Sequence, residues 1–197
     1  NLRVGDNMYC DEDGNGILDY DDYVYLGSSD PEMSYSFNFG LGWKEIIEVN
    51  IVFQGAGNRF IYRGNTTNWT VPCRGLYMNN LAASIDNTWT VDRPDAYYAP
   101  YTNDANINAY NYQASSLTAQ DGRYIRLKDV TLRLNMPRKW LANQQAVSAF
   151  SLYVTGSDLW ESTKIVDGWD PESKITTSGT SLYPFTRNVT VGVNMAF

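Results

Sequence analysis

The sequence predicts an all-β fold, an antiparallel segment of a transmembrane β-barrel, and three observations lead to this fold class. Five segments alternate apolar and polar residues with a period of two. Aromatic residues make up 14% of the chain, yet the mean hydropathy is only −0.40. Short and long connections alternate between the five segments. Strands of a membrane barrel alternate lipid-facing apolar residues with lumen-facing polar residues, so their average hydropathy stays near neutral.

Residues 34–43 and 47–54 predict a β-hairpin. In the first segment every second side chain is aromatic or apolar, and in the second the apolar residues include positions 47, 49, 51 and 53. Lys44 and Glu45 lie between the segments and are predicted to form the turn. Each strand is about ten residues long, which suits a tilted strand that crosses a bilayer and exceeds the usual five or six residues of soluble strands.

Residues 124–136 predict a third strand that contains an irregularity. Its apolar residues fall at positions 125 and 127 in the first half and at 130, 132, 134 and 136 in the second half. The parity therefore changes near Lys128 and Asp129. A β-bulge adds one residue to a strand and inverts the alternation, so a bulge at this point would return all the apolar residues to one face.

Residues 148–158 and 188–197 predict the fourth and fifth strands. In residues 148–158 Phe150, Leu152 and Val154 share one parity, while Ser, Tyr and Thr occupy the other. The last segment alternates Val, Met and Phe with Asn, Thr, Gly and Ala up to Phe197. Both patterns are typical of strands with one apolar face.

The connections give these strands a direction. Residues 44–45 and 137–147 are short links, whereas residues 56–122 and 159–186 are long. Membrane barrels have short periplasmic turns and long extracellular loops, so the last strand should run inward and place Phe197 at the periplasmic face. Two sets of aromatic residues are then expected at opposite membrane interfaces: Trp43, Trp140 and Phe197 at one, and Tyr35, Phe53 and Tyr124 at the other.

Composition argues against several partners and chemistries. A formal net charge of −7 and a pI near 4.5 disfavour nucleic acid or an anionic lipid surface, since both require clustered cations. The chain has no His, and Cys10 and Cys73 lack a basic partner motif, so we do not expect an enzyme. The two cysteines could pair in an oxidising compartment, but their spacing does not decide it. Four cations are expected near the lumen and to pair with carboxylates: Arg123, Arg126, Lys128 and Arg133.

Residues 11–22 follow the spacing of a calcium-binding loop. Oxygen ligands are expected at alternate positions, with a backbone carbonyl at the seventh, and Gly16 permits the sharp turn. The last ligand position holds Asp22 where the template has Glu, so we expect weak affinity or tolerance of Mg²⁺. The alternative is an acidic turn capped by Asp side chains without metal. The candidate ligands for a structural Ca²⁺ are Asp11, Asp13, Asn15, Ile17, Asp19 and Asp22.

An aromatic stretch lies within the long segment 56–122. Its rings could stack on sugars or peptide side chains, with nearby Asn and Asp residues as hydrogen-bond partners. The alternative is that the rings pack the loop on itself or against a protein that covers it. The candidate substrate-binding residues are Trp89, Tyr97, Tyr98, Tyr101, Tyr110 and Tyr112.

Several motifs occur in a fixed order along most of the chain. They are DEDGNGILD from residue 11, YSFNFG from 35, FQG from 53, DGRYIRLKDVTL from 121, PRK from 137, LYVTGSDL from 152, GWDPE from 168, and the terminal strand. Each motif alone is weak. Together they resemble the C-terminal barrel region of the SusC/RagA family of TonB-dependent outer-membrane transporters.

This resemblance implies a single-chain, 22-stranded barrel in the outer membrane, filled by an N-terminal plug, of which this chain would hold about the last five strands. It implies import of oligosaccharides or peptides, driven by TonB through parts absent from this chain and assisted by a SusD-like surface lipoprotein. Residues 1–33 would form an extracellular loop with the calcium motif. Residues 34–197 would form the barrel strands, with long extracellular loops at 56–122 and 159–186.

Two other classes of protein fit parts of the pattern. A soluble antiparallel sandwich could direct the same alternation toward an internal core, which would make the chain a secreted calcium-dependent carbohydrate-binding or adhesion module. Such a module should be soluble and should melt cooperatively without detergent. A passive porin is the third class, and a plug domain with a TonB-contacting segment upstream would exclude it.

Overall fold

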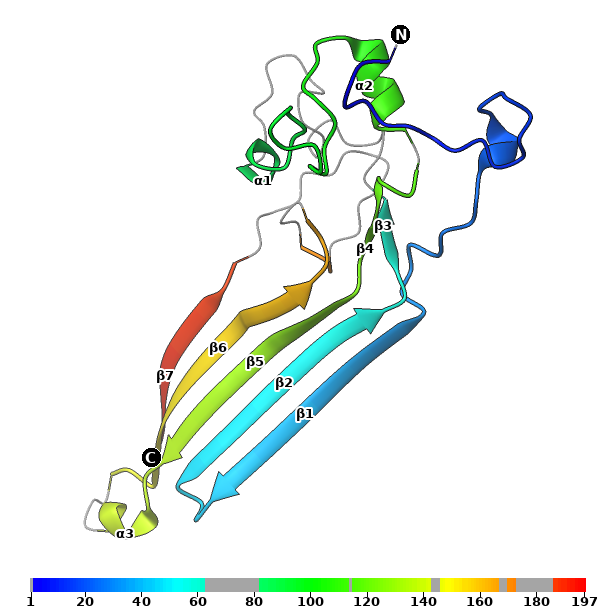
Figure 1. The fold of residues 1–197 in the computed structure, drawn as a ribbon. Coiled ribbons are helices and arrows are strands. Elements are labelled where there is room, and N and C mark those ends of the chain that lie inside the picture. Colours follow the sequence, from blue (N-terminus) through cyan, green and yellow to red (C-terminus); the bar gives the residue numbers. More distant parts are fainter. Residues whose placement is uncertain (1, 63–81, 114, 143–145, 167–169, 173–185) are drawn as a thin grey trace. The chain divides into compact units, whose positions relative to one another are not determined.

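The computed structural model describes the chain apart from residues 1, 63–81, 114, 143–145, 167–169 and 173–185 (Figure 1). Cys73 lies outside the described residues, and Cys10 is exposed. The chain divides into two compact units. The first comprises residues 1–30, 58–122 and 164–183, and the second comprises residues 31–57, 123–163 and 184–197.

The second unit is a five-stranded antiparallel sheet. Its strand order is β1-β2-β5-β6-β7 (Figure 1). The strands of this unit therefore lie side by side in the order in which they occur in the sequence. All five predicted strands are confirmed, at lengths of 9 to 15 residues. Their bounds are β1 Met33–Trp43, β2 Ile47–Gly57, β5 Tyr124–Asn135, β6 Ala149–Thr163 and β7 Asn188–Ala196.

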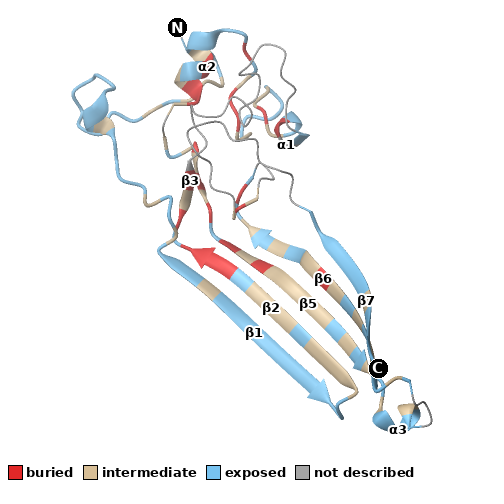
Figure 2. Ribbon diagram, turned by 180° about the vertical axis from the view of Figure 1, so that it is seen from behind, coloured by how far each residue is buried: buried red, intermediate tan, exposed pale blue. Residues whose placement is uncertain are grey.

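The two faces of this sheet have opposite character. The register pairs residues in rows that cross all five strands, and side chains of successive residues in a strand point to opposite faces. Apolar rows therefore share one face and polar rows the other. The outer strands β1 and β7 are largely exposed (Figure 2). One apolar row contains Leu41, Val49, Leu132, Val154 and Val191, and the next, polar, row contains Gly40, Asn50, Thr131, Thr155 and Thr190.

The predicted bulge is confirmed at Lys128. Leu127 and Asp129 both pair with β2 and with β6, but the register passes over Lys128 on both sides. On β6 the same step passes over Asp158 and Leu159, and Asp158 has a positive φ of 56°. The prediction that the fourth strand ends at residue 158 was wrong, because the chain resumes pairing beyond the bulge and β6 continues to Thr163.

The predicted turn at residues 44–45 is also confirmed. The N–H of Ile46 donates to the carbonyl of Trp43 at 3.0 Å, and Lys44 and Glu45 both have positive φ. Positive φ at both central residues is the feature of the primed turns that suit the twist of a β-hairpin. The link after β5 holds a short helix, α3, Arg138–Leu141, in which Trp140 is exposed.

The first unit collects the three segments that flank or join the strands. A short hairpin pairs β3, Phe60–Tyr62, with β4, Ala119–Asp121. Two α-helices, α1 Ala82–Ile85 and α2 Ala105–Asn111, and a 3₁₀ helix, η1 Tyr20–Asp22, complete its regular structure in the described residues. None of the helices described is long and apolar enough to span a membrane.

Candidate functional site

The acidic loop, residues 11–22, is held together by hydrogen bonds from backbone N–H groups to carboxylates. Asp11 accepts from Gly14 and Gly16, both at 2.7 Å, and these glycines have positive φ. Asp22 accepts from the N–H of Glu12 at 2.7 Å and of Asp19 at 2.8 Å, which ties the two ends of the loop together. The pKa of Asp11 is lowered, and the hydrogen bond from the Gly16 N–H is the main cause, so this carboxylate stays ionised.

Part of the predicted metal-ligand set is brought together. Carboxylate oxygens of Asp11, Asp13 and Asp22 lie within 4.8 Å of one another. Anionic oxygen donors at this spacing are the chemistry that a hard cation such as Ca²⁺ prefers. Asn15 instead accepts from the N–H of Ile17 at 2.6 Å, and Asp19 accepts from the N–H of Asp21 as the cap of η1. Ca²⁺ occupancy therefore stays a prediction.

The predicted aromatic substrate-binding residues fall into different environments. Tyr98 and Tyr112 are buried with Ala99, and Tyr97 packs against them. The Tyr97 hydroxyl donates to the carbonyl of Leu117. These rings form a small core, the alternative reading of the same stretch. The remaining three are more open: Trp89 is half-buried, Tyr101 is exposed, and Tyr110 is half-buried.

Asn111, at the end of α2, is one of the Asn residues near the aromatic stretch that were expected to hydrogen-bond a ligand, but it is fully buried and bonds to the N-terminal segment instead. Its side chain accepts from the N–H of Asn7 and donates to Asp6, each at 2.8 Å. Asp6 also accepts from Arg3, and these bonds outweigh the effect of burial and lower the pKa of Asp6. A lone Asn carries no sequence signature for such a role. Asn111 is thus a hub that fastens the N-terminal segment to α2.

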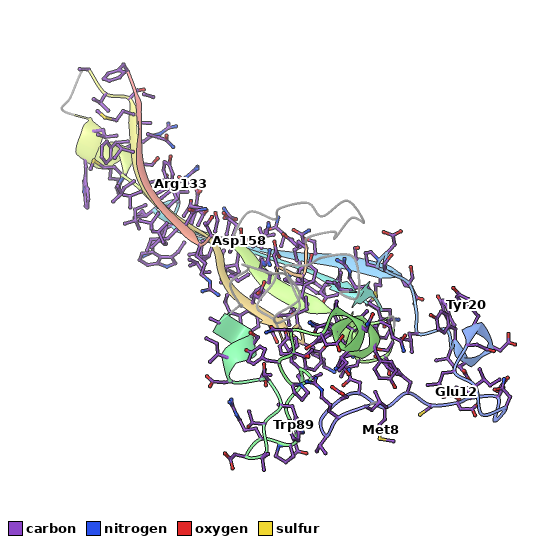
Figure 3. All side chains as sticks on the ribbon, turned by 90° about the horizontal axis from the view of Figure 1, so that it is seen from above. Met8, Glu12, Tyr20, Trp89, Arg133 and Asp158 are labelled. Atoms are coloured by element: carbon purple, nitrogen blue, oxygen red, sulfur yellow. The ribbon has the colours of Figure 1, made fainter. Side chains whose placement is uncertain are left out.

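Next to this hub the first unit contains a cleft of about 720 Å³. It lies between the acidic loop with its flanking residues and the chain from α2 to β4. Tyr9 crosses from one wall to the other: its ring meets Tyr110 edge-on at 5.1 Å and its hydroxyl donates to the Tyr110 carbonyl. Met8, Glu12 and Tyr20 are labelled along the N-terminal segment in Figure 3. The lining includes four tyrosines, Tyr9, Tyr20, Tyr23 and Tyr110, and three carboxylates, Glu12, Asp19 and Asp22.

Three of the four cations that were expected to pair with carboxylates form separate ion pairs in the sheet. Arg126 is buried and donates to Glu161 of the neighbouring strand through two nitrogens. Lys128 pairs with Asp158 at 3.2 Å, so the bulged residues of β5 and β6 bind each other. Near the other end of the sheet, Arg133 on β5 lies 3.9 Å from Glu48 on β2.

Comparison with known proteins identifies relatives of the whole chain. TonB-dependent receptor P26 of Formosa agariphila is 29% identical over 98% of this chain, and TonB-dependent receptor P3 of the same organism is 27% identical over 98%. The chain is thus similar to TonB-dependent receptors over nearly its whole length. It spans about a fifth of the length of these relatives, 20% and 19% respectively. No known family model matches the sequence.

Solved structures are similar to this chain in fold. The RagAB peptide importer in its closed-closed state superimposes with a TM-score of 0.66 over 93% of this chain and 20% of that one, at 21% identity. Its open-open state gives a TM-score of 0.62 over 87% of this chain and 18% of that one, at 20% identity. The resemblance to SusC/RagA transporters and the antiparallel fold class predicted from the sequence are thereby confirmed.

Proposed function

We propose that this chain forms the C-terminal barrel strands of an outer-membrane importer that takes up oligosaccharides or peptides with energy from TonB. The observation that carries this proposal is the sheet with one apolar and one polar face. Phe39 and Leu41 on β1 are 54% and 71% exposed, and Val191 on β7 is 66% exposed. Apolar rows of this width suit lipid hydrocarbon, while the opposite face, with its Arg, Glu, Thr and Asn residues, suits a water-filled lumen.

The edges of the sheet support placement in a larger barrel. In the described sheet β1 and β7 each pair with one neighbour only. An unpaired backbone N–H or C=O costs several kcal/mol in hydrocarbon, because lipid offers no hydrogen-bonding partner. We therefore propose that further strands of the same transporter pair with β1 and β7 and close the barrel. A plug and the TonB-contacting segment would belong to the same transporter.

Transport in this proposal depends on conformational change and not on covalent chemistry. The ion pairs of the polar face, such as Arg126 with Glu161, would keep the wall rigid while the plug moves. The C-terminus would lie at the periplasmic face. The first unit would be extracellular, where a SusD-like surface lipoprotein would cover it. The more open members of the aromatic set, the exposed Tyr101 and the half-buried Trp89, would contact substrate.

The transport proposal is tested by uptake of labelled oligosaccharides and peptides into cells that express the complete transporter. Uptake should stop when TonB is deleted or the proton gradient is collapsed. Uptake that continues without TonB would identify a passive pore instead. If the 197-residue chain folds cooperatively without detergent, the soluble carbohydrate-binding or adhesion module is the better description.

We further propose that the acidic loop binds Ca²⁺ as a structural ion, supported by the approach of Asp11, Asp13 and Asp22 to within 4.8 Å. Calorimetry on the protein should show weak Ca²⁺ binding, which Asp11→Asn weakens at least about tenfold. Asp21→Asn is the matched control, because Asp21 lies in the loop but outside the ligand set, and it should change affinity little. Absence of binding at several millimolar Ca²⁺, or equal losses in both variants, would refute the proposal.

A further inference from the structure

We infer that the cleft of the first unit binds the cationic side chains of a basic peptide. The first observation is the shape and lining of the cleft. Its volume of about 720 Å³ falls within the usual range of ligand sites, and four tyrosine rings supply apolar contact. Tyr20 and Tyr23 pack edge-on at 5.5 Å, yet they remain 84% and 63% exposed, so their faces are open to a ligand.

The second observation is the charge around these rings. Glu12, Asp19 and Asp22 line the cleft, and none of its lining residues in the described part of the chain is Lys or Arg. Asp22 is occupied by backbone N–H groups, whereas the side chain of Glu12 has no ion pair among the described residues. An open carboxylate beside aromatic rings is the combination that attracts an ammonium or guanidinium group.

The wider sequence strengthens this charge. Residues 4–43 contain no Lys or Arg, and residues 11–22 contain six carboxylates, Asp11, Glu12, Asp13, Asp19, Asp21 and Asp22. A bound divalent cation would remove two charges from six and leave four, so the cleft would remain anionic with the loop occupied. Met8, Leu18 and Val24 add apolar surface along the same walls. This surface suits the aliphatic stems that carry the charges of Lys and Arg.

The chemistry of the lining also excludes some ligands. A polyanion would meet uncompensated carboxylates and no cation in the described lining, so it should be repelled. An uncharged ligand would gain ring contact but nothing from Glu12. A short peptide with alternating Arg residues gains both, because alternate side chains of an extended strand share one side. The inference concerns binding alone and does not require that the ligand be transported.

The test is fluorescence anisotropy on the purified complete protein in detergent, with a labelled pentapeptide in which alanine alternates with arginine. The isosteric peptide with citrulline in place of arginine removes the charge and keeps the shape. We expect the arginine peptide to bind more tightly, and the difference to shrink as salt is raised. The arginine peptide should bind more tightly than the citrulline peptide both with and without Ca²⁺. Equal binding of the two peptides would overturn the inference.

Matched variants separate the cleft from general attraction to an acidic protein. Tyr20→Ala and Glu12→Gln should each weaken the arginine peptide about threefold to fivefold. Tyr25→Ala and Asp92→Asn are the controls, because both residues are exposed and neither lines the cleft. Equal losses in cleft and control variants would overturn the inference. Binding is measured without TonB or an energy source, so a negative result here leaves the transport proposal standing.

Discussion

Gly55 on β2 offers the sharpest test of how the strands pack. A Cβ atom added there would lie 2.5 Å from the backbone carbonyl oxygen of Tyr124 on β5 and 2.5 Å from the ring of Tyr35 on β1. Ordinary contacts begin near 3.4 Å, so the shortfall is 0.9 Å. The Tyr35 hydroxyl donates to the same carbonyl at 2.9 Å, which fixes the ring over the glycine. We expect Gly55→Ala to destabilise the protein by about 3 kcal/mol, the upper end of the range for overpacking.

Two other glycines of the sheet serve as a matched series. At Gly192 the added Cβ would meet only the outer ring of Tyr153, a side chain that can turn away, so the loss should be about 1 kcal/mol. At Gly42 nothing lies within 4 Å, and alanine should be neutral or slightly stabilising. Thermal unfolding in detergent, followed by circular dichroism, should show the Gly55 variant to be the least stable, the Gly192 variant intermediate and the Gly42 variant the most stable. Equal losses at Gly42 and Gly55 would refute the reasoning.

Three further predictions address single interactions. Arg126→Met leaves Glu161 without its buried partner and should lower the free energy of unfolding by about 3 kcal/mol. Replacing both residues by Met should recover part of this stability in a thermal melt. A double variant no more stable than the single one would contradict this prediction. Asp6 has a lowered pKa, so its stabilising effect is present above the unfolded pKa near 3.8 and fades as the pH falls through the lower, folded value. Asp6→Asn keeps the size of the side chain beside the buried Asn111 but cannot ionise. In limited proteolysis at a series of pH values, the resistance of its first unit should therefore no longer fall at acid pH. Lys44→Gly should raise the melting temperature slightly, because glycine adopts a positive φ without strain, and a lower melting temperature would argue against strain at this turn.

The strands and the bulge were predictable because each rests on a local alternation. The change of parity between Leu127 and Val130 fixes where an extra residue must be absorbed, whatever the neighbouring strands are. The end of β6 was not predictable in this way. Asp158 resembles a strand terminus in sequence, and only its pairing across the bulge with β5 shows that the strand continues to Thr163.

The first unit was less accessible to sequence reasoning because its contacts join distant segments. Asn7 and Asn111 are far apart along the chain, and neither belongs to a recognisable motif, yet their hydrogen bonds fix one wall of the cleft. The aromatic stretch showed a similar limit. Composition marks Tyr98 and Tyr101 alike, whereas the fold buries the first and exposes the second.

The bulge divides the upper and lower parts of the sheet at a point where chain length can change. The register skips Lys128 on one strand and Asp158 with Leu159 on the other, and Lys128 pairs with Asp158. Leu127 with Trp160 and Asp129 with Ser157 continue the ladder on either side. Excision of all three residues together should therefore join two ladders already in phase and leave both faces intact. A variant that still folds, with an unchanged β-sheet circular dichroism spectrum, would show that the parts of the sheet on either side of the bulge pair independently of it. A variant that no longer folds would show that the sheet requires the bulge.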